Sequence, residues 1–397
     1  MRSVAKLRIA LVGAGRRGAG AHLPVIRKLD DVYELAAICD KDEEAAGRLA
    51  RELGVPFYTS VRDLVRRERI DVADVVVPVD AHHAVAIYLM DHGIHVIVET
   101  PIAPTLALAD MMIAGAQRGR VKLEVAENYY RAPIERFKAK VIDSGLIGDV
   151  SRIYRIFYEG SYHGMNVLRT HARGRPTAVM GVGHTTPVEP ITDRMNRHHR
   201  QEHWTMGIID FDNGVMAIQM YSNVVHARSL GRGQVGISQI DGTKGSIVGE
   251  RVYVVPPEEM HTGARAAGID PERVTRQVGG VTVLEALRLP GTDVVWENPL
   301  ARYPLTEGQV AVADELLSIA RAVLDDVEPE YGAAQGRLDQ EMNIGMIESG
   351  RVDRRTIHFP LTAPTSYEEE IHASFAKNYG FAADDVEGLL DVFFPRR

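Results

Sequence analysis

Leu7-Arg8-Ile9-Ala10-Leu11-Val12-Gly13-Ala14-Gly15-Arg16-Arg17-Gly18 is the stretch that decides the fold around it. Residues 9–12 are apolar throughout, which predicts a short buried strand. Three glycines follow as G-x-G-x-x-G where this strand turns into a helix. The first glycine allows a tight turn, the second lets the backbone approach a pyrophosphate, and the third lets helix and strand pack closely. The free N–H groups and the dipole of that helix then favour bound phosphate.

A second apolar strand, predicted at 35–38, leads to Asp40, which stands 22 residues after Gly18. A carboxylate at this distance is positioned to bind the ribose of an adenosine. The stretch therefore predicts a dinucleotide site made by Gly13, Gly15, Gly18 and Asp40. Because a carboxylate repels a 2′-phosphate, Asp40 favours NAD. NADP stays open, since the neighbouring cations Arg16, Arg17 and Lys41 are able to hold a phosphate.

Composition limits the classes of function. The chain has 397 residues, a formal net charge of −8 and 45% hydrophobic residues, and it has no run of basic residues, so neither nucleic acid nor an anionic membrane is an expected partner. Cys39 is the sole cysteine, which excludes an internal disulfide and a thiolate metal cluster. There is no apolar run of membrane-spanning length and no signal-like N-terminus, so we expect a cytoplasmic protein.

Strand and helix patterns alternate through residues 1–127. Further buried strands are predicted at 72–77, 95–98 and 121–126, with amphipathic or apolar helices between them. Continuous apolar strands joined by crossover helices indicate a parallel, doubly wound Rossmann sheet, which binds ligands at the carboxyl ends of its strands. Residues 78–83 and 99–101 follow such strands and are therefore expected near Asp40.

After residue 149 the pattern becomes β-rich. Predicted strands at 204–211 and 215–222 flank Asp212-Asn213-Gly214, a strong hairpin signal. These patterns predict a C-terminal α+β domain with an open, mostly antiparallel sheet, covered by long helices at 306–324 and 332–349. We assign 1–127 and 128–364 to the two domains, while the tail at 365–397 has no predicted place. An open sheet needs cover, so we expect a homodimer or homotetramer formed through it.

Several short motifs, in their order and spacing, resemble those of the Gfo/Idh/MocA oxidoreductases over roughly residues 5 to 360. Besides the glycine turn they are a T-P-x-x-x-H-like loop, a G-K-H-V-x-x-E-K-P-like stretch, an F-N-x-R-F-like segment and an S-G-x-I/L-G-x-V turn, found here at 77–82, 93–101, 126–131 and 144–150. The resemblance implies a Rossmann domain followed by an α/β domain with an open sheet. It also implies cofactor contacts at Pro78, His82, Glu99, Thr100 and Asn128.

The chain departs from this family pattern at two places. Thr100 stands where the family has the lysine of E-K-P, which lies beside the nicotinamide and supplies a charge or a proton; threonine is no general acid near neutral pH. The segment before the family's D-x-G-x-H-x-x-D helix is also shortened. We align His163 with its catalytic histidine, Glu159 with its first aspartate and Asn166 with its last.

These alignments imply a catalytic group of His163, Tyr129, Glu159 and Thr100. His163 would carry the proton, because imidazole titrates near neutral pH. Glu159 would orient the His163 ring or bind a substrate hydroxyl. The alternative is that Glu159 lies in a surface turn as a carboxylate exposed to solvent. Tyr129 or Tyr130 would replace the missing donor, unless the pair serves packing. Expected substrate contacts are Tyr130, His163, Asn166 and His184.

Histidines and carboxylates also gather at 184–203, but without a recognised ligand spacing, so we predict no metal site there. Residues 187–201 are interpreted as a loop, serving as a mobile lid or a subunit contact.

Three functions remain open. The first is an NAD(P)-dependent oxidoreductase that transfers a hydride to or from a small polyhydroxylated substrate such as a sugar or cyclitol. The second retains NAD for transient redox during elimination, epimerisation or glycoside cleavage, or reduces an imine or enone. The third is a cofactor-binding protein without catalysis, supported by Thr100 alone.

Overall fold

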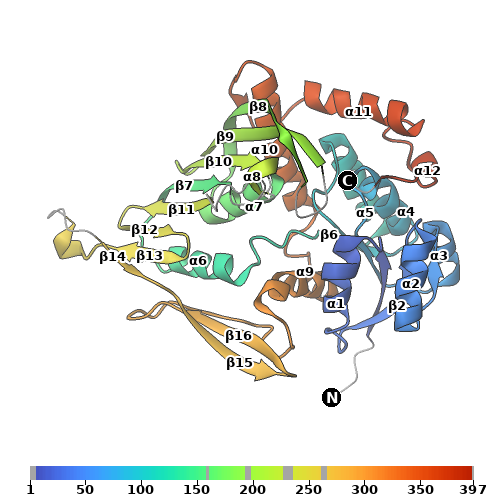
Figure 1. Cartoon of the computed structure of the whole chain (residues 1–397), viewed down its shortest axis with the longest axis horizontal. Coiled ribbons are helices and arrows are strands. Elements are labelled where there is room, and N and C mark those ends of the chain that lie inside the picture. Colours follow the sequence, from blue (N-terminus) through green and yellow to red (C-terminus); the bar gives the residue numbers. More distant parts are fainter. Residues whose placement is uncertain (1–5, 158–160, 193–197, 227–235, 261–265, 396–397) are drawn as a thin grey trace.

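The computed structural model describes residues 6–157, 161–192, 198–226, 236–260 and 266–395. Its first sheet has six parallel strands in the order β3-β2-β1-β4-β5-β6 (Figure 1). The strands are β1 (Leu7–Val12), β2 (Tyr33–Cys39), β3 (Phe57–Tyr58), β4 (Val72–Val75), β5 (His95–Val98) and β6 (Leu123–Val125). The order reverses between β1 and β4, which opens a ligand crevice at their carboxyl ends. The predicted Rossmann sheet is confirmed.

Helices cover this sheet. They are α1 (Leu23–Ile26), α2 (Glu43–Leu53), α3 (Val61–Arg67), η2 (Val79–Ala81), α4 (His82–Asp91) and α5 (Leu106–Gly119). The helix after the glycine turn begins as one π-helical turn, η1 (Gly18–His22), before α1. Pro24 in the first turn of α1 has no N–H to donate, which explains the break in a regular α-helix. Ser60 caps α3, because its side chain accepts the Arg62 N–H.

The second sheet is mixed and has nine strands in the order β14-β13-β12-β11-β7-β10-β9-β8-β18. Only β7 and β10 run parallel among its recorded pairings. The strands are β7 (Val150–Ile156), β8 (Pro176–Thr192), β9 (His198–Phe211), β10 (Met216–Ser222), β11 (Ile237–Gly242), β12 (Gly245–Val248), β13 (Arg251–Val254), β14 (Ala267–Ile269) and β18 (Ile357–His358). The predicted turn joins β9 to β10, and Gly214 there has a φ of 83°. The open, mostly antiparallel sheet is confirmed.

The prediction of a loop at 187–201 is wrong for its described residues. β8 continues to Thr192 and β9 begins at His198, and the two pair down to Thr192 opposite His198. Backbone pairing along a long two-stranded ribbon outweighs the prolines and arginines that indicated a loop.

Helices α7 (Ser161–Ala172) and α10 (Ala333–Arg351) pack on one face of the second sheet. The other long helix, α9 (Glu307–Leu324), contacts α1, α6 (Pro133–Asp143) and β5, not this sheet as expected. α9 buries residues on several sides, including Val310, Val312 and Leu316, so it fills the space between the two halves of the molecule. A small sheet of β15 (Glu272–Val278), β16 (Val281–Arg288) and β17 (Val295–Glu297) was not predicted. Short helices α8 (Asn223–His226) and η3 (Pro257–Glu259) complete this half.

The tail at 365–397 contains two helices, α11 (Ser366–Tyr379) and α12 (Val386–Leu389). Figure 1 shows both helices returning to the Rossmann half beside α4 and α5. Thr365 and Glu368 form a reciprocal capping box at the start of α11. None of the helices among the described residues is long and apolar enough to cross a membrane.

Candidate active site

The glycine turn closely approaches the neighbouring strand. Gly13 has a φ of 113°, and a Cβ there would lie 2.2 Å from the Val76 carbonyl oxygen. A Cβ on Gly18 would lie 2.1 Å from the Gly13 carbonyl oxygen. Side chains are therefore excluded at both positions, and the backbone forms the kind of cradle that a pyrophosphate requires.

Asp40 stands at the end of β2, next to this cradle. Its carboxylate accepts the Ala14 N–H at 2.6 Å and the Asp42 N–H at 2.8 Å. A cavity of about 310 Å³ opens here, lined among others by Gly13, Gly15, Arg16, Arg17, Asp40 and Pro78. The carboxyl ends of β1, β2 and β4 thus form a site with the shape and donors for a dinucleotide.

His82 lies just beneath this site without lining the cavity. Its ring nitrogens lie 2.9 Å from the Pro101 carbonyl and 2.9 Å from the Val77 carbonyl. Burial lowers the pKa of the ring, so His82 is neutral. Through these two hydrogen bonds, the His82 ring connects the loop after β4 to the loop after β5.

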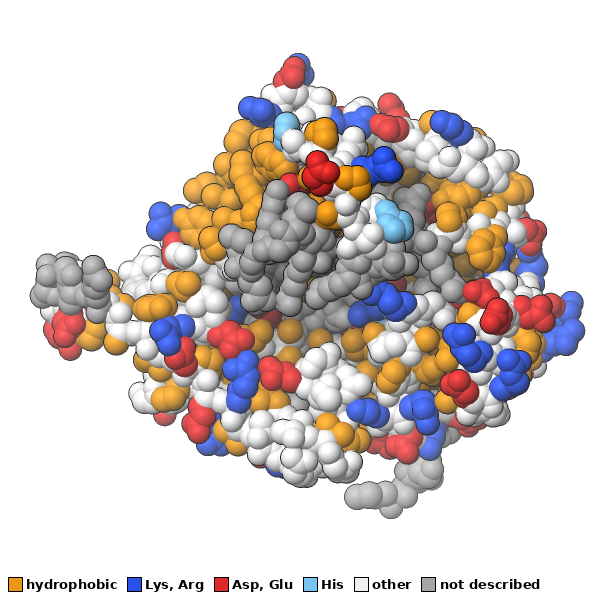
Figure 2. All heavy atoms as spheres, viewed as in Figure 1, with side chains coloured by type: hydrophobic (Ala, Val, Ile, Leu, Met, Phe, Trp, Pro, Cys, Tyr) orange, Lys and Arg blue, Asp and Glu red, His pale blue; other side chains and the backbone are white. Residues whose placement is uncertain are grey.

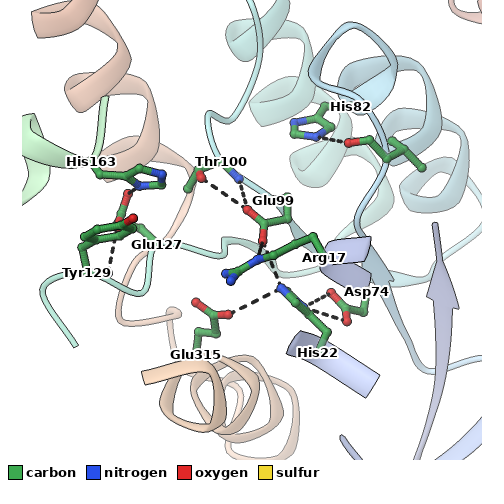
Figure 3. Close-up of polar contacts among 11 residues, drawn as sticks. Arg17, His22, Asp74, His82, Glu99, Thr100, Glu127, Tyr129, His163 and Glu315 are labelled. Carbon is green, nitrogen blue, oxygen red and sulfur yellow. Dashed lines mark hydrogen bonds and ion pairs between the residues drawn. The ribbon is translucent and has the colours of Figure 1, made fainter. Parts of the chain in front are cut away.

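A buried cluster of charges lies where β5 ends (Figure 3). Glu99 accepts hydrogen bonds from Arg17 Nε, from His22 Nε2 at 3.0 Å and from the Thr100 N–H at 2.9 Å. His22 Nδ1 reaches Asp74 on β4 at 3.0 Å. Arg17 therefore pairs with Glu99, while its partly exposed side chain also lines the cavity beside Asp40.

The charges of this cluster alter its pKa values. Burial opposes the charge on His22, but Asp74 and Glu99 outweigh it and raise the His22 pKa to about 10. Burial likewise opposes the Glu99 carboxylate, whereas His22 and Arg17 hold its pKa well below the ordinary range. Two cations therefore lie beside two carboxylates; His22 and Asp74 are buried, and the Arg17 side chain is partly exposed.

Glu315 of α9 is the fifth member of the cluster. Its side chain is fully buried, its Oε1 lies 4.0 Å from His22 Nε2, and neither oxygen has a hydrogen-bond partner among the described residues. Burial raises the Glu315 pKa to about 8, although His22 and Arg17 act against this. At neutral pH Glu315 therefore binds a proton.

We expect the free energy of unfolding to fall as pH rises above neutrality. The folded-state pKa of Glu315 and that of His22 both lie above their unfolded values. Each group therefore contributes its full stabilisation below its unfolded pKa. This stabilisation is lost as pH rises through the folded-state pKa, about 8 for Glu315 and about 10 for His22. Glu315→Gln has no carboxyl group to titrate at this position, so it lacks the loss of stability that Glu315 causes. The melting temperature of this variant should therefore change less than that of the wild type between about pH 7 and pH 9. The exposed control Glu297→Gln should follow the wild type; identical curves for all three proteins would contradict the prediction.

Beyond Thr100, His163 forms an ion pair with Glu127. His163 Nδ1 lies 2.9 Å from Glu127 Oε2, while Glu127 Oε1 accepts the Tyr129 N–H at 2.9 Å. The Tyr129 ring stacks on the imidazole with centroids 4.2 Å apart. Figure 3 shows this group on the opposite side of Thr100 from Glu99 and Arg17. Burial lowers the His163 pKa, but Glu127 outweighs it, so the net shift is upward.

The remaining predicted residues lie at varied distances from this centre. Thr100 donates from Oγ1 to Glu99 at 3.3 Å, and Asn128 is half-buried between Glu127 and Tyr129 in the chain. Asn166 is buried and donates to Asp339 at 3.3 Å. Tyr130 donates to Glu330 at 3.2 Å, and Arg136 of α6 lies over its ring. His184 lies beside Trp204 on the β8–β9 ribbon, and Glu159 lies outside the described residues.

Four residues of the centre were not predicted from the sequence: His22, Asp74, Glu127 and Glu315. Glu127 falls inside the quoted segment 126–131, and its position directly after a buried strand is a signal that would have found it. The other three are isolated polar residues in apolar surroundings, and only their pairing in space marks them. Within the described part of the chain, no three or more histidine, cysteine or carboxylate side chains are grouped so that they could hold a metal ion.

Residues 7–127 match the Gfo/Idh/MocA family model, described as an oxidoreductase family with an NAD-binding Rossmann fold. D-apiose dehydrogenase of Paraburkholderia graminis is 28% identical over 37% of this chain and 39% of its own. A glycosyl hydrolase family 109 protein of Shewanella pealeana is 29% identical over 36% of this chain and 33% of its own. The chain thus matches well under half of each relative's length.

The fold of the whole chain has solved counterparts. An oxidoreductase domain protein from Kribbella flavida superposes with a TM-score of 0.70 at 20% identity, covering 90% of this chain and all of the other. The match over residues 7–127 and the geometry of the glycine turn agree on one assignment. Residues 7–127 of this chain are thus similar to the NAD-binding Rossmann domain of the Gfo/Idh/MocA oxidoreductases.

Proposed function

We propose that this protein is an NAD-dependent oxidoreductase that interconverts a carbinol and a carbonyl on a small polyhydroxylated molecule. The observation that carries the proposal is the His163–Glu127 pair, which is stacked with Tyr129 and lies on the other side of Thr100 from the Arg17–Glu99 pair (Figure 3). The likeness to a dehydrogenase of the sugar apiose supports a carbohydrate substrate.

The chain's own residues provide the cofactor site. The cradle at Gly13 and Gly15 receives the pyrophosphate, and Asp40 the adenosine ribose. NAD, when bound, accepts or supplies the hydride. Glu99 and Thr100 directly follow β5, so in this proposal they lie at the nicotinamide end of the bound cofactor.

His163 moves the proton in this proposal. Glu127 holds Nδ1 and orients the ring, so Nε2 is the nitrogen turned from Glu127 and available to a substrate oxygen. The upward pKa shift keeps His163 protonated over more of the neutral range, which suits donation to a carbonyl that is being reduced. Tyr129 limits the ring's rotation by stacking on it.

Arg17 supplies the charge that Thr100 lacks. Its pKa is raised above the ordinary range for arginine, so the guanidinium is always positive and does not donate its proton to the substrate. A fixed cation stabilises negative charge that develops on a substrate oxygen. The two roles of the family's lysine are thus divided here, with charge from Arg17 and the proton from His163.

The direct test mixes purified protein with NADH or NADPH and a panel of sugars and keto-sugars. The expected result is a substrate-dependent change in the nicotinamide absorbance band with NADH. No change with any substrate, together with no cofactor binding, would contradict the proposal.

A second candidate is transient redox with a retained cofactor, as in glycoside cleavage through a keto intermediate. It is favoured by the likeness to a glycosyl hydrolase family 109 protein. NAD that copurifies with the protein, with turnover that needs no added cofactor, would favour it, whereas a stoichiometric requirement for NADH would contradict it.

We expect Asp40 to determine the choice of NAD. Asp40→Ser removes the carboxylate that binds the ribose and repels a 2′-phosphate, so the Kd for NADH should rise roughly 10-fold and that for NADPH should fall. The control Asp42→Ser removes only the cap of α2 and should leave the ratio of the two constants unchanged. Isothermal titration with both cofactors measures the ratio; an unchanged ratio in Asp40→Ser would exclude this role.

We further propose that the free face of the second sheet binds another copy of the chain. Met180, Met216, Ile237 and Val248 are 37–42% exposed, and their cross-strand pairings place them on one face, opposite α7 and α10. Figure 2 shows hydrophobic side chains gathered over β8–β10, at the upper left.

A charge on this face should therefore dissociate the oligomer, since it would be buried unpaired. Met216→Glu is expected to reduce the mass measured by light scattering to that of one chain. Leu324→Glu, at an exposed residue of α9, is the matched control and should keep the wild-type mass. A wild-type monomer would refute the interface.

A further inference from the structure

We propose that the C-terminal segment 381–394 forms the outer wall of the adenine subsite in the proposed cofactor site. Five residues of this segment line the same cavity as Gly13, Gly15 and Asp40, and they are Leu389, Leu390, Val392, Phe393 and Phe394. Opposite them lie apolar residues of the Rossmann half, including Val61, Ala81 and Val85. The inference rests on the proposed use of a dinucleotide, and it adds an element that no motif in the Rossmann half indicates.

The segment is held in place by specific contacts. The buried ring of His83 lies with Nε2 2.7 Å from the Ala383 carbonyl, and burial lowers the His83 pKa to about 4, so neutral His83 donates this bond. Tyr379 donates to Asp80, in the loop after β4. Phe394 packs against Tyr379 with ring centroids 4.7 Å apart. The last residues therefore have a fixed position over the crevice.

An ion pair anchors the helix that carries the wall. Arg62 of α3 donates to Glu387 at 2.6 Å and to Asp391 at 2.7 Å, on either side of Leu389 and Leu390. These two leucines are buried, whereas Phe393 is 61% exposed at the cavity mouth. An exposed aromatic ring beside apolar side chains at the mouth of a cavity is an arrangement in which a nucleobase stacks and covers the ring.

The position of the wall identifies adenine as the part that it contacts. Asp40 receives the adenosine ribose, and the pyrophosphate cradle lies inward of it, so the cavity beyond Asp40 takes the base. The charge cluster and His163 lie on either side of Thr100 (Figure 3), which the proposed function assigns to the nicotinamide end. Loss of the wall should therefore weaken binding of the base and leave the nicotinamide end as it is.

The test compares NADH with reduced nicotinamide mononucleotide, which lacks the adenosine. Dissociation constants are measured by titration for the wild type, Phe393→Ala, a chain ending at residue 380, and the exposed control Leu324→Ala. Phe393→Ala should raise the Kd for NADH roughly 5- to 10-fold, and the shortened chain more, with the mononucleotide constant unchanged. Leu324→Ala should match the wild type for both ligands.

Other outcomes would overturn the proposal. An unchanged NADH constant in both variants would show that the segment does not contact the base. Equal loss for both ligands would show general disruption of the fold. Tighter NADH binding by the shortened chain would make the segment a competitor for the site. Wild-type protein that binds no NADH would refute the cofactor assignment as well, which separates that failure from failure of the wall alone.

Discussion

His163→Asn should lower kcat by about 10²- to 10⁴-fold while the Kd for NADH stays within about twofold of the wild type. The range is that for removal of a positioned general acid or base. Asparagine still provides a hydrogen-bond donor to the buried Glu127. The decrease in kcat therefore measures the missing proton transfer and not the cost of an unpaired carboxylate. Stopped-flow or steady-state kinetics with the substrate found in the panel gives kcat, and a fluorescence titration gives Kd.

Two further variants test this assignment. His358→Asn, at an exposed residue of β18, should retain wild-type kinetics. Glu127→Gln removes the charge that raises the His163 pKa. Carbonyl reduction needs protonated His163, so its rate falls as pH rises through that pKa, and in Glu127→Gln this fall should begin at lower pH. A kcat in His163→Asn within about threefold of the wild type would eliminate the histidine as proton carrier.

Arg17→Met should lower kcat by about 10²- to 10³-fold, the range for loss of one group that stabilises developing charge. Arg17→Lys keeps a positive charge near Glu99 and should recover part of the rate, though not all, because the geometry of the guanidinium is lost. Kinetics are compared with the melting temperature of each variant, since Glu99 keeps only His22 as a cationic partner when Arg17 is removed.

Arg16→Met separates charge stabilisation from phosphate binding. Arg16 and Arg17 both line the proposed cofactor cavity, but Arg17 also pairs with Glu99, next to Thr100. Replacement of Arg16 should therefore raise the Kd for NADH with little change in kcat. If Arg17→Met behaves in the same way, Arg17 binds cofactor and does not replace the missing lysine. A normal kcat at saturating NADH would be the decisive observation against its proposed role.

Local patterns predicted the Rossmann half well, for a physical reason. Buried parallel strands are apolar along their whole length, and the turn at Gly13 tolerates no side chain. Both constraints act over a few residues, so they are visible in the sequence. The hairpin at Asp212–Gly214 was predictable for the same reason, because its turn residues determine the backbone.

The failures concern contacts between distant segments. The β8–β9 ribbon is stabilised by cross-strand pairing, and its composition alone resembles a loop. α9 has apolar residues on several sides, which does not specify the surface that it covers. The tail carries a cap that marks its helix, but its docking site on α4 depends on His83, about 300 positions earlier.

The sequence by itself determined the strand–turn–helix at residues 7–18, the carboxylate Asp40 after the second strand and a threonine, Thr100, where the similar family has lysine, because each depends on neighbours in the chain. Only the tertiary structure decided which charges lie near Thr100. Arg17 is interpreted from the sequence as a phosphate ligand, but folding brings the end of β5 beside it, and its guanidinium pairs with Glu99. In the same way residues 389–394 line the cavity beside Gly13 and Asp40. Charges buried together must neutralise one another, and which charges meet is determined by packing over the whole chain.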